Sequence, residues 1–189
     1  MEKITAKDFI KIPNLMSMFR ILLIPVFLYF AFSVGFEEGK LYIFSVLLLS
    51  WLTDILDGFI ARKYNMISEL GKILDPMADK LTQLAILFAL WLSKLVPAFV
   101  FIIIFIKEFL LSIGALYLKK FIKTNIIPSN YWGKAATGCF YISVALLILK
   151  DYVGMIGMYG IYLTLILMII AFISYWRILL QIMRKEKEV

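Results

Sequence analysis

Long apolar runs recur along the whole chain and constrain its fold more than any other feature. Six of them, each of about 20 residues, are separated by short polar stretches. A helix of that length spans the hydrocarbon core of a bilayer. Spanning segments must satisfy their backbone hydrogen bonds internally, and these runs are too long for the strands of a membrane barrel. The pattern therefore predicts an all-α integral membrane protein.

Breaker and turn residues between the runs predict the boundaries of six transmembrane helices in a single domain covering residues 1–189. Residues 1–13 mix lysines with Ile and Phe, which predicts a short amphipathic segment at the membrane interface, ended by Pro13. Pro25 is expected to kink the first span. Within a bundle at 15–183, the spans are expected at about 15–35, 41–63, 71–93, 97–119, 133–149 and from Gly157 onward.

Basic residues gather on one side of the predicted membrane. With six spans both termini lie on the same side, and 16 Lys and Arg residues fall there against three on the other. This asymmetry predicts that the termini and the region around residues 51–81 face the cytoplasm. The net charge of +7 is then expected to serve anionic headgroups, at Lys119, Lys120 and Lys123 for example, and not nucleic acid.

Four aspartates stand close together between residues 51 and 81. Asp54 and Asp57 are three residues apart, so they share one helix face. Asp75 and Asp79, four residues apart, share a face of the next helix. Carboxylates inside a membrane cost about 2.5–3.5 kcal/mol each, so four of them need a compensating ion. The chain has no histidine and one cysteine, and oxygen ligands favour Mg²⁺, Mn²⁺ or Ca²⁺ over zinc.

Small and basic residues extend both aspartate stripes. Gly58 and Ala61 lack bulk, so a flat or anionic group can approach the helix closely. Arg62 offers a planar, permanently charged fork that suits phosphate. Gly71 precedes Asp75 by one turn and continues its stripe. Two such helices packed together place four carboxylates around one or two divalent ions, which suits a diphosphate substrate and leaves one carboxylate to take a proton.

The motif D-x-x-D-G-x-x-A-R, then eight residues, then G-x-x-x-D-x-x-x-D resembles the signature of the CDP-alcohol phosphotransferases. The resemblance covers the whole chain. It implies transfer of a phosphatidyl or similar group from a CDP-linked donor to an alcohol, release of CMP, and a homodimer. The eight matching positions are Asp54, Asp57, Gly58, Ala61, Arg62, Gly71, Asp75 and Asp79.

The resemblance also implies roles for these residues. Asp54, Asp57 and Asp75 resemble the ligands of one Mg²⁺ or Mn²⁺ ion. Asp54, Asp75 and Asp79 resemble those of a second ion, and Asp79 also resembles the base that deprotonates the acceptor. Gly58, Arg62 and Ser68 are similar to positions that contact the donor. The expected donor site also includes Ala61, Gly71 and Asn14, and Asn14 is either a donor contact or a helix cap.

The opening I-P-N-x-x-T/S-x-x-R-x-x-x-x-P, carried by Asn14 and Arg20, resembles that of phosphatidylglycerophosphate synthases and the related cardiolipin synthases. This favours transfer from CDP-diacylglycerol to sn-glycerol 3-phosphate, which gives phosphatidylglycerophosphate. The alternative is a cardiolipin synthase that uses phosphatidylglycerol. A divalent-cation carrier is a third possibility, but the non-cytoplasmic halves of the predicted helices are almost purely apolar.

The expected acceptor residues depart from the pattern of these synthases. Where they usually have Arg-Glu or Arg-Asp in the fourth helix, this chain has Lys107-Glu108. Lys107 is expected to line the acceptor cavity, and the alternative is a self-neutralising pair. Adjacent helical residues point about 100° apart, which favours different partners. Lys134 lies at the start of the predicted fifth helix, where those synthases usually have G-K-x-K-T. This lysine either binds an acceptor phosphate or only follows the positive-inside rule.

Overall fold

The regular structure of the described residues is helical throughout. The computed structural model describes residues 6–117 and 131–187, and the chain divides into two compact units, Met1–Leu95 and Val96–Val189. The predicted all-α class is confirmed. The predicted single domain over 1–189 stays a prediction.

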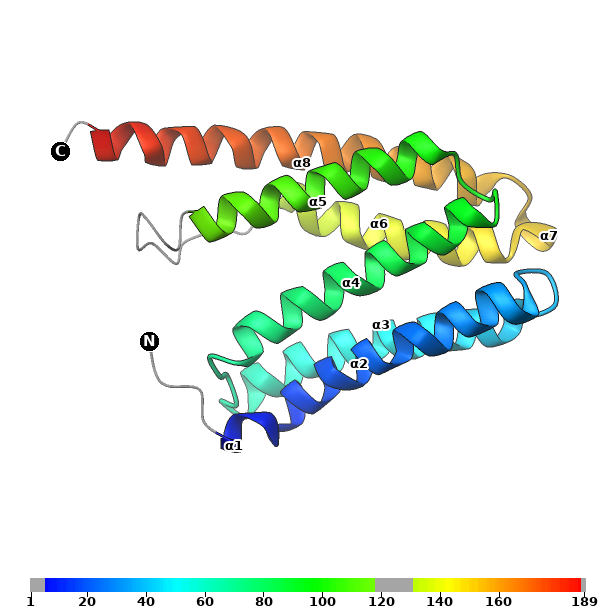
Figure 1. Ribbon diagram of the computed structural model, residues 1–189, viewed down its shortest axis with the longest axis horizontal. Helices are drawn as coiled ribbons and strands as arrows, with labels where there is room; N and C mark the ends of the chain where they lie inside the picture. The colour runs from blue at the N-terminus through cyan, green and yellow to red at the C-terminus, as the bar shows by residue number, and fades with distance from the viewer. Residues whose placement is uncertain (1–5, 118–130, 188–189) are drawn as a thin grey trace. The chain divides into compact units, whose positions relative to one another are not determined.

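The first unit contains a short helix and three long ones. α1 is Ala6–Phe9, α2 is Ile12–Tyr29 with a π-helical continuation η1 at Phe30–Val34, α3 is Lys40–Lys63 and α4 is Gly71–Leu92. α2 packs against both α3 and α4, as can be followed in Figure 1. The connection of 64–70 between α3 and α4 is short, so the end of α3 and the start of α4 lie near each other.

α2 begins at Ile12 and not at residue 15 as predicted. Pro13 lies in its first turn, where a missing N–H loses no helical hydrogen bond, so the prediction that Pro13 ends the preceding segment is wrong. Residues 1–5 of that segment lie outside the described residues, and Ile10 beside α1 is 72% exposed. The interfacial placement stays a prediction, and so does a kink at Pro25, which lies inside α2.

The end of α3 is set by a residue in the left-handed conformation. Asn65 has a φ of 51°, and the Met66 N–H donates to the Ala61 carbonyl at 3.0 Å. This is the bond by which a Schellman motif satisfies a carbonyl at a helix end, and asparagine tolerates the left-handed region better than most residues. α4 ends in the same way at Lys94, whose φ is 57°. Both ends agree with the predicted boundaries.

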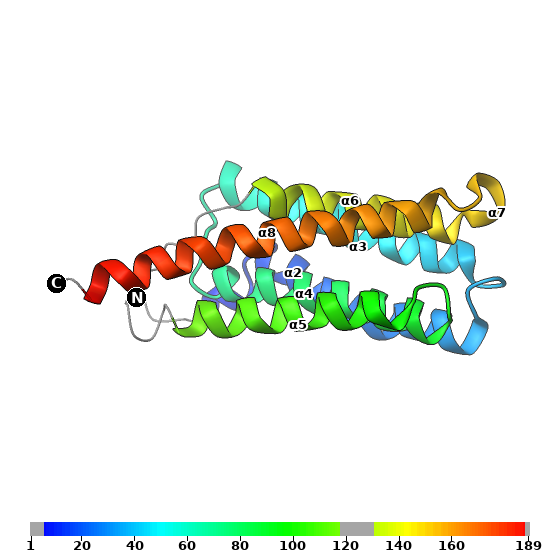
Figure 2. The same cartoon turned by 90° about the horizontal axis from the view of Figure 1, so that it is seen from above.

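The second unit contains α5 (Ala98–Tyr117), α6 (Tyr131–Ile148), the single turn α7 (Lys150–Val153) and α8 (Ile156–Lys187). α8 packs against both α5 and α6, and Figure 2 shows it running between them. With 32 residues, α8 is about 48 Å long, more than the roughly 30 Å of a hydrocarbon core. Its C-terminal turns therefore continue past the apolar span.

Glycines allow α8 to approach α6 closely. A Cβ added to Gly157 would lie 2.6 Å from the Leu147 Cα, and one added to Gly160 would lie 3.0 Å from the Ser143 Cβ. Backbone atoms cannot turn aside, so the contact at Gly157 admits no side chain. Close backbone approach through small residues is a common way for helices to pack in membranes.

The Gly157→Ala variant is expected to unfold at a lower temperature than the wild type, measured by thermal denaturation in detergent. The added methyl group forces α8 away from α6, and overpacking of this kind costs about 1–3 kcal/mol. Gly138→Ala in α6 is the matched control, because a Cβ there meets nothing within 4 Å. Equal melting temperatures for the two variants would contradict this account of the packing.

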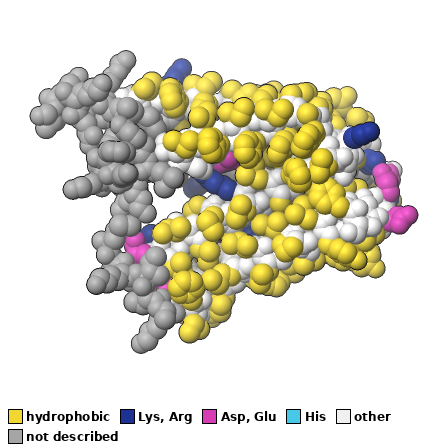
Figure 3. Space-filling model, in the orientation of Figure 1, with side chains coloured by type: hydrophobic (Ala, Val, Ile, Leu, Met, Phe, Trp, Pro, Cys, Tyr) yellow, Lys and Arg dark blue, Asp and Glu magenta, His cyan; other side chains and the backbone are white. Residues whose placement is uncertain are grey.

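Four helical stretches of the described chain are long and apolar enough to cross a membrane: Ile12–Val34, Lys40–Lys63, Tyr131–Ile148 and Ile156–Arg177. Hydrophobic side chains cover most of the described surface visible in Figure 3. α4 and α5 are helical as predicted but are not among the four, so a count of six spans stays a prediction. Lys119, Lys120 and Lys123 lie outside the described residues.

Candidate metal and donor site

Three of the four aspartates converge in the first unit. One carboxylate oxygen from each of Asp54, Asp57 and Asp75 lies within 4.8 Å of the other two. α3 places the first two on one face, as their spacing predicts, and α4 brings Asp75 to them. The side chain of Asp57 is 4% exposed, whereas those of Asp54 and Asp75 are 37% and 50% exposed. The cluster is therefore buried at Asp57 and accessible from the side of the other two.

Asp79 is not a member of this cluster. It follows Asp75 by about one turn of α4, or roughly 6 Å along the helix axis, and is half-buried. Its roles as base and as ligand of a second ion stay predictions.

A guanidinium group sits against the three carboxylates. Arg20 of α2 is 1% exposed, and one of its terminal nitrogens pairs with Asp54. The other terminal nitrogen, Nη2, lies 2.5 Å from an Asp57 oxygen and 3.6 Å from an Asp75 oxygen. Ser17, one turn earlier on α2, donates its hydroxyl to Asp57 at 3.3 Å.

Sequence reasoning used Arg20 only as part of the N-terminal motif and missed this pairing. A signal was present, because a charged side chain within an apolar span needs a partner. The sequence also predicts that Arg20 and the aspartates lie on the same side of the membrane. The spacing within one helix could not show that α2 reaches them.

The cluster suits a divalent cation. Its donors are carboxylate oxygens, which Mg²⁺ and Mn²⁺ prefer. The Asp75 side chain is 50% exposed, so the cluster can be reached by an ion from this side. The residues present therefore fit the predicted metal, with Asp54, Asp57 and Asp75 as the side chains that would hold it.

A cavity of about 160 Å³ adjoins the cluster. Asp57 and Asp75 are part of its wall, so a molecule inside it reaches the proposed ligands directly. Five of the six residues predicted to bind the donor also line it, namely Asn14, Gly58, Ala61, Ser68 and Gly71. The structure thus brings together residues that the sequence distributes over three helices and a connection.

A buried hydrogen-bond network forms one wall of this cavity. The Asn14 amide donates to the Asp8 carbonyl at 2.6 Å and to the Ser68 hydroxyl at 2.8 Å. The same hydroxyl accepts the backbone N–H of Gly71 at 3.0 Å, at the start of α4. A Cβ on Gly71 would lie 2.6 Å from Asn14 Oδ1, so a side chain at position 71 would have to displace this amide. Asn14 does not cap α2, whose N-cap is Lys11.

Arg62, the sixth predicted donor residue, is exposed beside the cavity and does not line it. One of its terminal nitrogens lies 3.6 Å from the position that a Cβ on Gly58 would take. The guanidinium therefore lies over Gly58, next to the cavity that Gly58 lines. This position is compatible with a phosphate contact.

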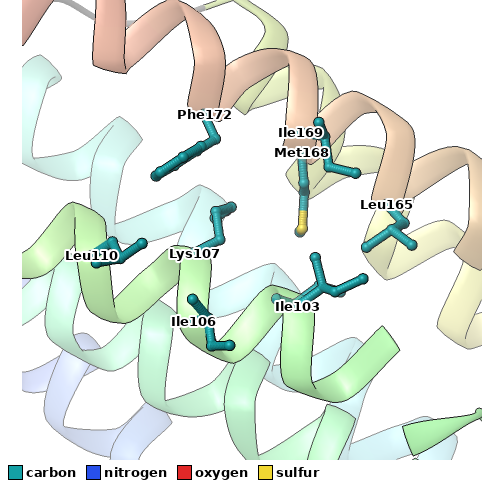
Figure 4. A pocket seen from close by; sticks show the side chains of 9 residues that line it. Ile103, Ile106, Lys107, Leu110, Leu165, Met168, Ile169 and Phe172 are labelled. Carbon is teal, nitrogen blue, oxygen red and sulfur yellow. The ribbon is translucent and has the colours of Figure 1, made fainter. Parts of the chain in front are cut away.

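The two predicted acceptor residues lie in the second unit. The Lys107 ammonium pairs with Glu108, as in the alternative of a self-neutralising pair. Its alkyl chain lines a cavity of about 190 Å³ between α5 and α8, which is otherwise apolar (Figure 4). Lys134 is exposed in the first turn of α6. An acceptor role for either lysine stays a prediction.

Comparison with known proteins agrees with this site. A family model described as CDP-alcohol phosphatidyltransferase matches residues 10–179. The chain is 34% identical over 149 residues to a cardiolipin synthase (CMP-forming) of Streptomyces coelicolor, covering 77% of this chain and 68% of that protein.

Two proteins named CDP-diacylglycerol–glycerol-3-phosphate 3-phosphatidyltransferase are also similar. The one from Aquifex aeolicus is 37% identical over 139 residues, covering 72% of this chain and 73% of that protein. The one from Bacillus subtilis is 32% identical over 152 residues, covering 74% and 77%. The match to the family model covers most of the chain, which therefore belongs to the CDP-alcohol phosphatidyltransferase family.

Proposed function

We propose that this enzyme transfers the phosphatidyl group of CDP-diacylglycerol to sn-glycerol 3-phosphate, giving phosphatidylglycerophosphate and CMP. The observation that carries the reaction type is the convergence of Asp54, Asp57 and Asp75 beside a cavity lined by predicted donor residues. The relatives from Aquifex aeolicus and Bacillus subtilis are named for this acceptor. Family membership favours an enzyme over a cation carrier.

Residues in and beside the cavity can each take one role in the reaction. Asp54, Asp57 and Asp75 would hold a divalent ion, which would supply positive charge to neutralise the diphosphate and polarise the phosphoryl group. Gly58 lets the diphosphate approach α3, and Arg62 binds a phosphate oxygen. Asp79 takes the proton of the acceptor hydroxyl. The acceptor oxygen then forms a bond to the phosphatidyl phosphorus, the bond from that phosphorus to the CMP oxygen breaks, and CMP leaves.

The enzyme is proposed to work as a homodimer in the bacterial inner membrane, with termini and site at the cytoplasmic face. The asymmetry of basic residues supports this orientation. A soluble acceptor such as glycerol 3-phosphate is then available on the side where the aspartates lie.

The second candidate is a cardiolipin synthase, favoured by the similarity to the protein from Streptomyces coelicolor. The test is an assay of CMP release and lipid product with purified protein, CDP-diacylglycerol and Mg²⁺, given either glycerol 3-phosphate or phosphatidylglycerol. Phosphatidylglycerophosphate from the first acceptor is the expected result. Product from phosphatidylglycerol alone would transfer the assignment to cardiolipin synthase and leave the reaction type unchanged.

The Gly58→Ala variant is expected to raise the apparent KM for CDP-diacylglycerol by about tenfold, a loss of roughly 1.4 kcal/mol in binding. The added methyl group narrows the cavity beside Asp57. Its nearest neighbour would be Arg62 at an ordinary 3.6 Å, and alanine favours a helix more than glycine does, so the melting temperature is expected not to fall below the wild-type value. A KM that does not move would exclude Gly58 from the donor site.

Lys134→Ala is expected to raise the apparent KM for glycerol 3-phosphate by about 10- to 150-fold, the loss of one charged hydrogen bond. The KM for the donor should hardly change. Lys63→Ala is the control, since this lysine at the end of α3 lies over the rings of Phe59 and Tyr64. If both changes raise the KM for glycerol 3-phosphate equally, Lys134 adds only general positive charge and does not bind the acceptor phosphate.

A further inference from the structure

We propose that Arg20 takes the place of the metal in the metal-free enzyme. Its guanidinium holds Asp54, Asp57 and Asp75 together when no divalent ion is present, and it lowers the affinity of the cluster for that ion. The inference rests on the proposed metal site.

The contacts of Arg20 support a role directed at the cluster. Its two terminal nitrogens reach all three carboxylates, on two different helices. Its Nε is buried and has no hydrogen-bond partner, so the guanidinium is held by charge and not by a wider network. An arginine cannot lose its proton in a protein, so the compensation is permanent.

The charges explain why the cluster needs such a group. Three carboxylates whose oxygens lie within 4.8 Å of one another repel each other, and the burial of Asp57 limits how far water and salt screen that repulsion. In the absence of a cation they would separate, and α3 and α4 would lose their register against α2. Arg20 prevents this, because it is 1% exposed and is anchored on the helix that packs against both.

The geometry also leaves a place for the ion. Arg20 meets the carboxylates from the buried side, where Asp57 is 4% exposed. Asp75 is 50% exposed and has the longest contact with Arg20, at 3.6 Å. An ion therefore enters at Asp75 and Asp54 while the guanidinium stays behind them. Two cations then share the same carboxylates, and their mutual repulsion makes the ion easier to release.

The test is Mn²⁺ binding to purified protein stripped of metal, measured by electron paramagnetic resonance, together with thermal unfolding in EDTA and in excess Mn²⁺. Arg20→Met removes the charge and keeps a long side chain. We expect it to bind Mn²⁺ about tenfold more tightly than the wild type and to unfold at a lower temperature in EDTA. By linkage, the rise in melting temperature on adding Mn²⁺ should be larger in this variant.

Two further variants make the experiment decisive. Arg62→Met removes a nearby arginine whose guanidinium lies over Gly58, and the Mn²⁺ affinity of this variant should change much less. Arg20→Lys keeps the charge and should match the wild-type melting temperature in EDTA within a few degrees. This second comparison also decides the matter if Arg20→Met does not fold.

An unchanged or weaker Mn²⁺ affinity in Arg20→Met overturns the proposal, and so does an Arg20→Lys protein that unfolds well below the wild type in EDTA. Failure of the metal site itself has a different signature. In that case the wild type binds no Mn²⁺ at all, and Asp57→Asn changes nothing.

Discussion

Asp57→Asn is expected to lower the turnover of CDP-diacylglycerol by at least about a thousandfold, because it removes a charged ligand of the proposed metal ion, which would stabilise the transition state. Several kcal/mol of such stabilisation correspond to a factor of this size. Asp57 is the most buried of the three carboxylates, so water cannot readily take its place. CMP release from the purified variant measures the loss, and Mn²⁺ binding should be lost with it.

EDTA should inactivate the wild type to the same extent, and added Mg²⁺ should restore it. Glu69→Gln is the control in the same unit, because Glu69 lies in the connection before α4 and pairs with Lys72. It should keep wild-type turnover. Full activity of Asp57→Asn, or of the wild type in EDTA, would remove the metal mechanism.

Asp79→Asn is also expected to abolish turnover, for a different reason. In the proposed mechanism Asp79 takes the proton of the acceptor hydroxyl, which an asparagine cannot do, and general-base catalysis contributes about 10²–10⁴ in rate. Asp79 lies outside the cluster of Asp54, Asp57 and Asp75, so Mn²⁺ binding and donor binding should persist. Equilibrium binding of both, measured beside turnover, separates the two roles.

A loss of Mn²⁺ affinity as large as that in Asp57→Asn would identify Asp79 as a ligand. The base would then be another group. Turnover at the wild-type rate with intact binding would exclude Asp79 from both roles.

The sequence by itself determined the elements and the faces of the site. Apolar runs predict membrane helices because the bilayer leaves the backbone no other partner, and four of the six predicted spans are confirmed as candidates. The spacing of Asp54 and Asp57 predicts a shared helix face because helical periodicity is local. The same periodicity places Gly58 and Ala61 on that stripe, and both line the cavity.

Only the tertiary structure decided which helices meet and which polar groups pair. Arg20 lies 34 residues before Asp54 in the chain, so no periodicity connects them, and their contact depends on how α2 packs against α3 and α4. The bond from Asn14 to Ser68 is of the same kind. For Lys107 and Glu108 the sequence pointed the other way. Neighbouring helical residues point about 100° apart, which favoured different partners, but the flexible side chains pair with each other. Pairing across helices depends on packing and side-chain reach, which the order of residues along one helix does not contain.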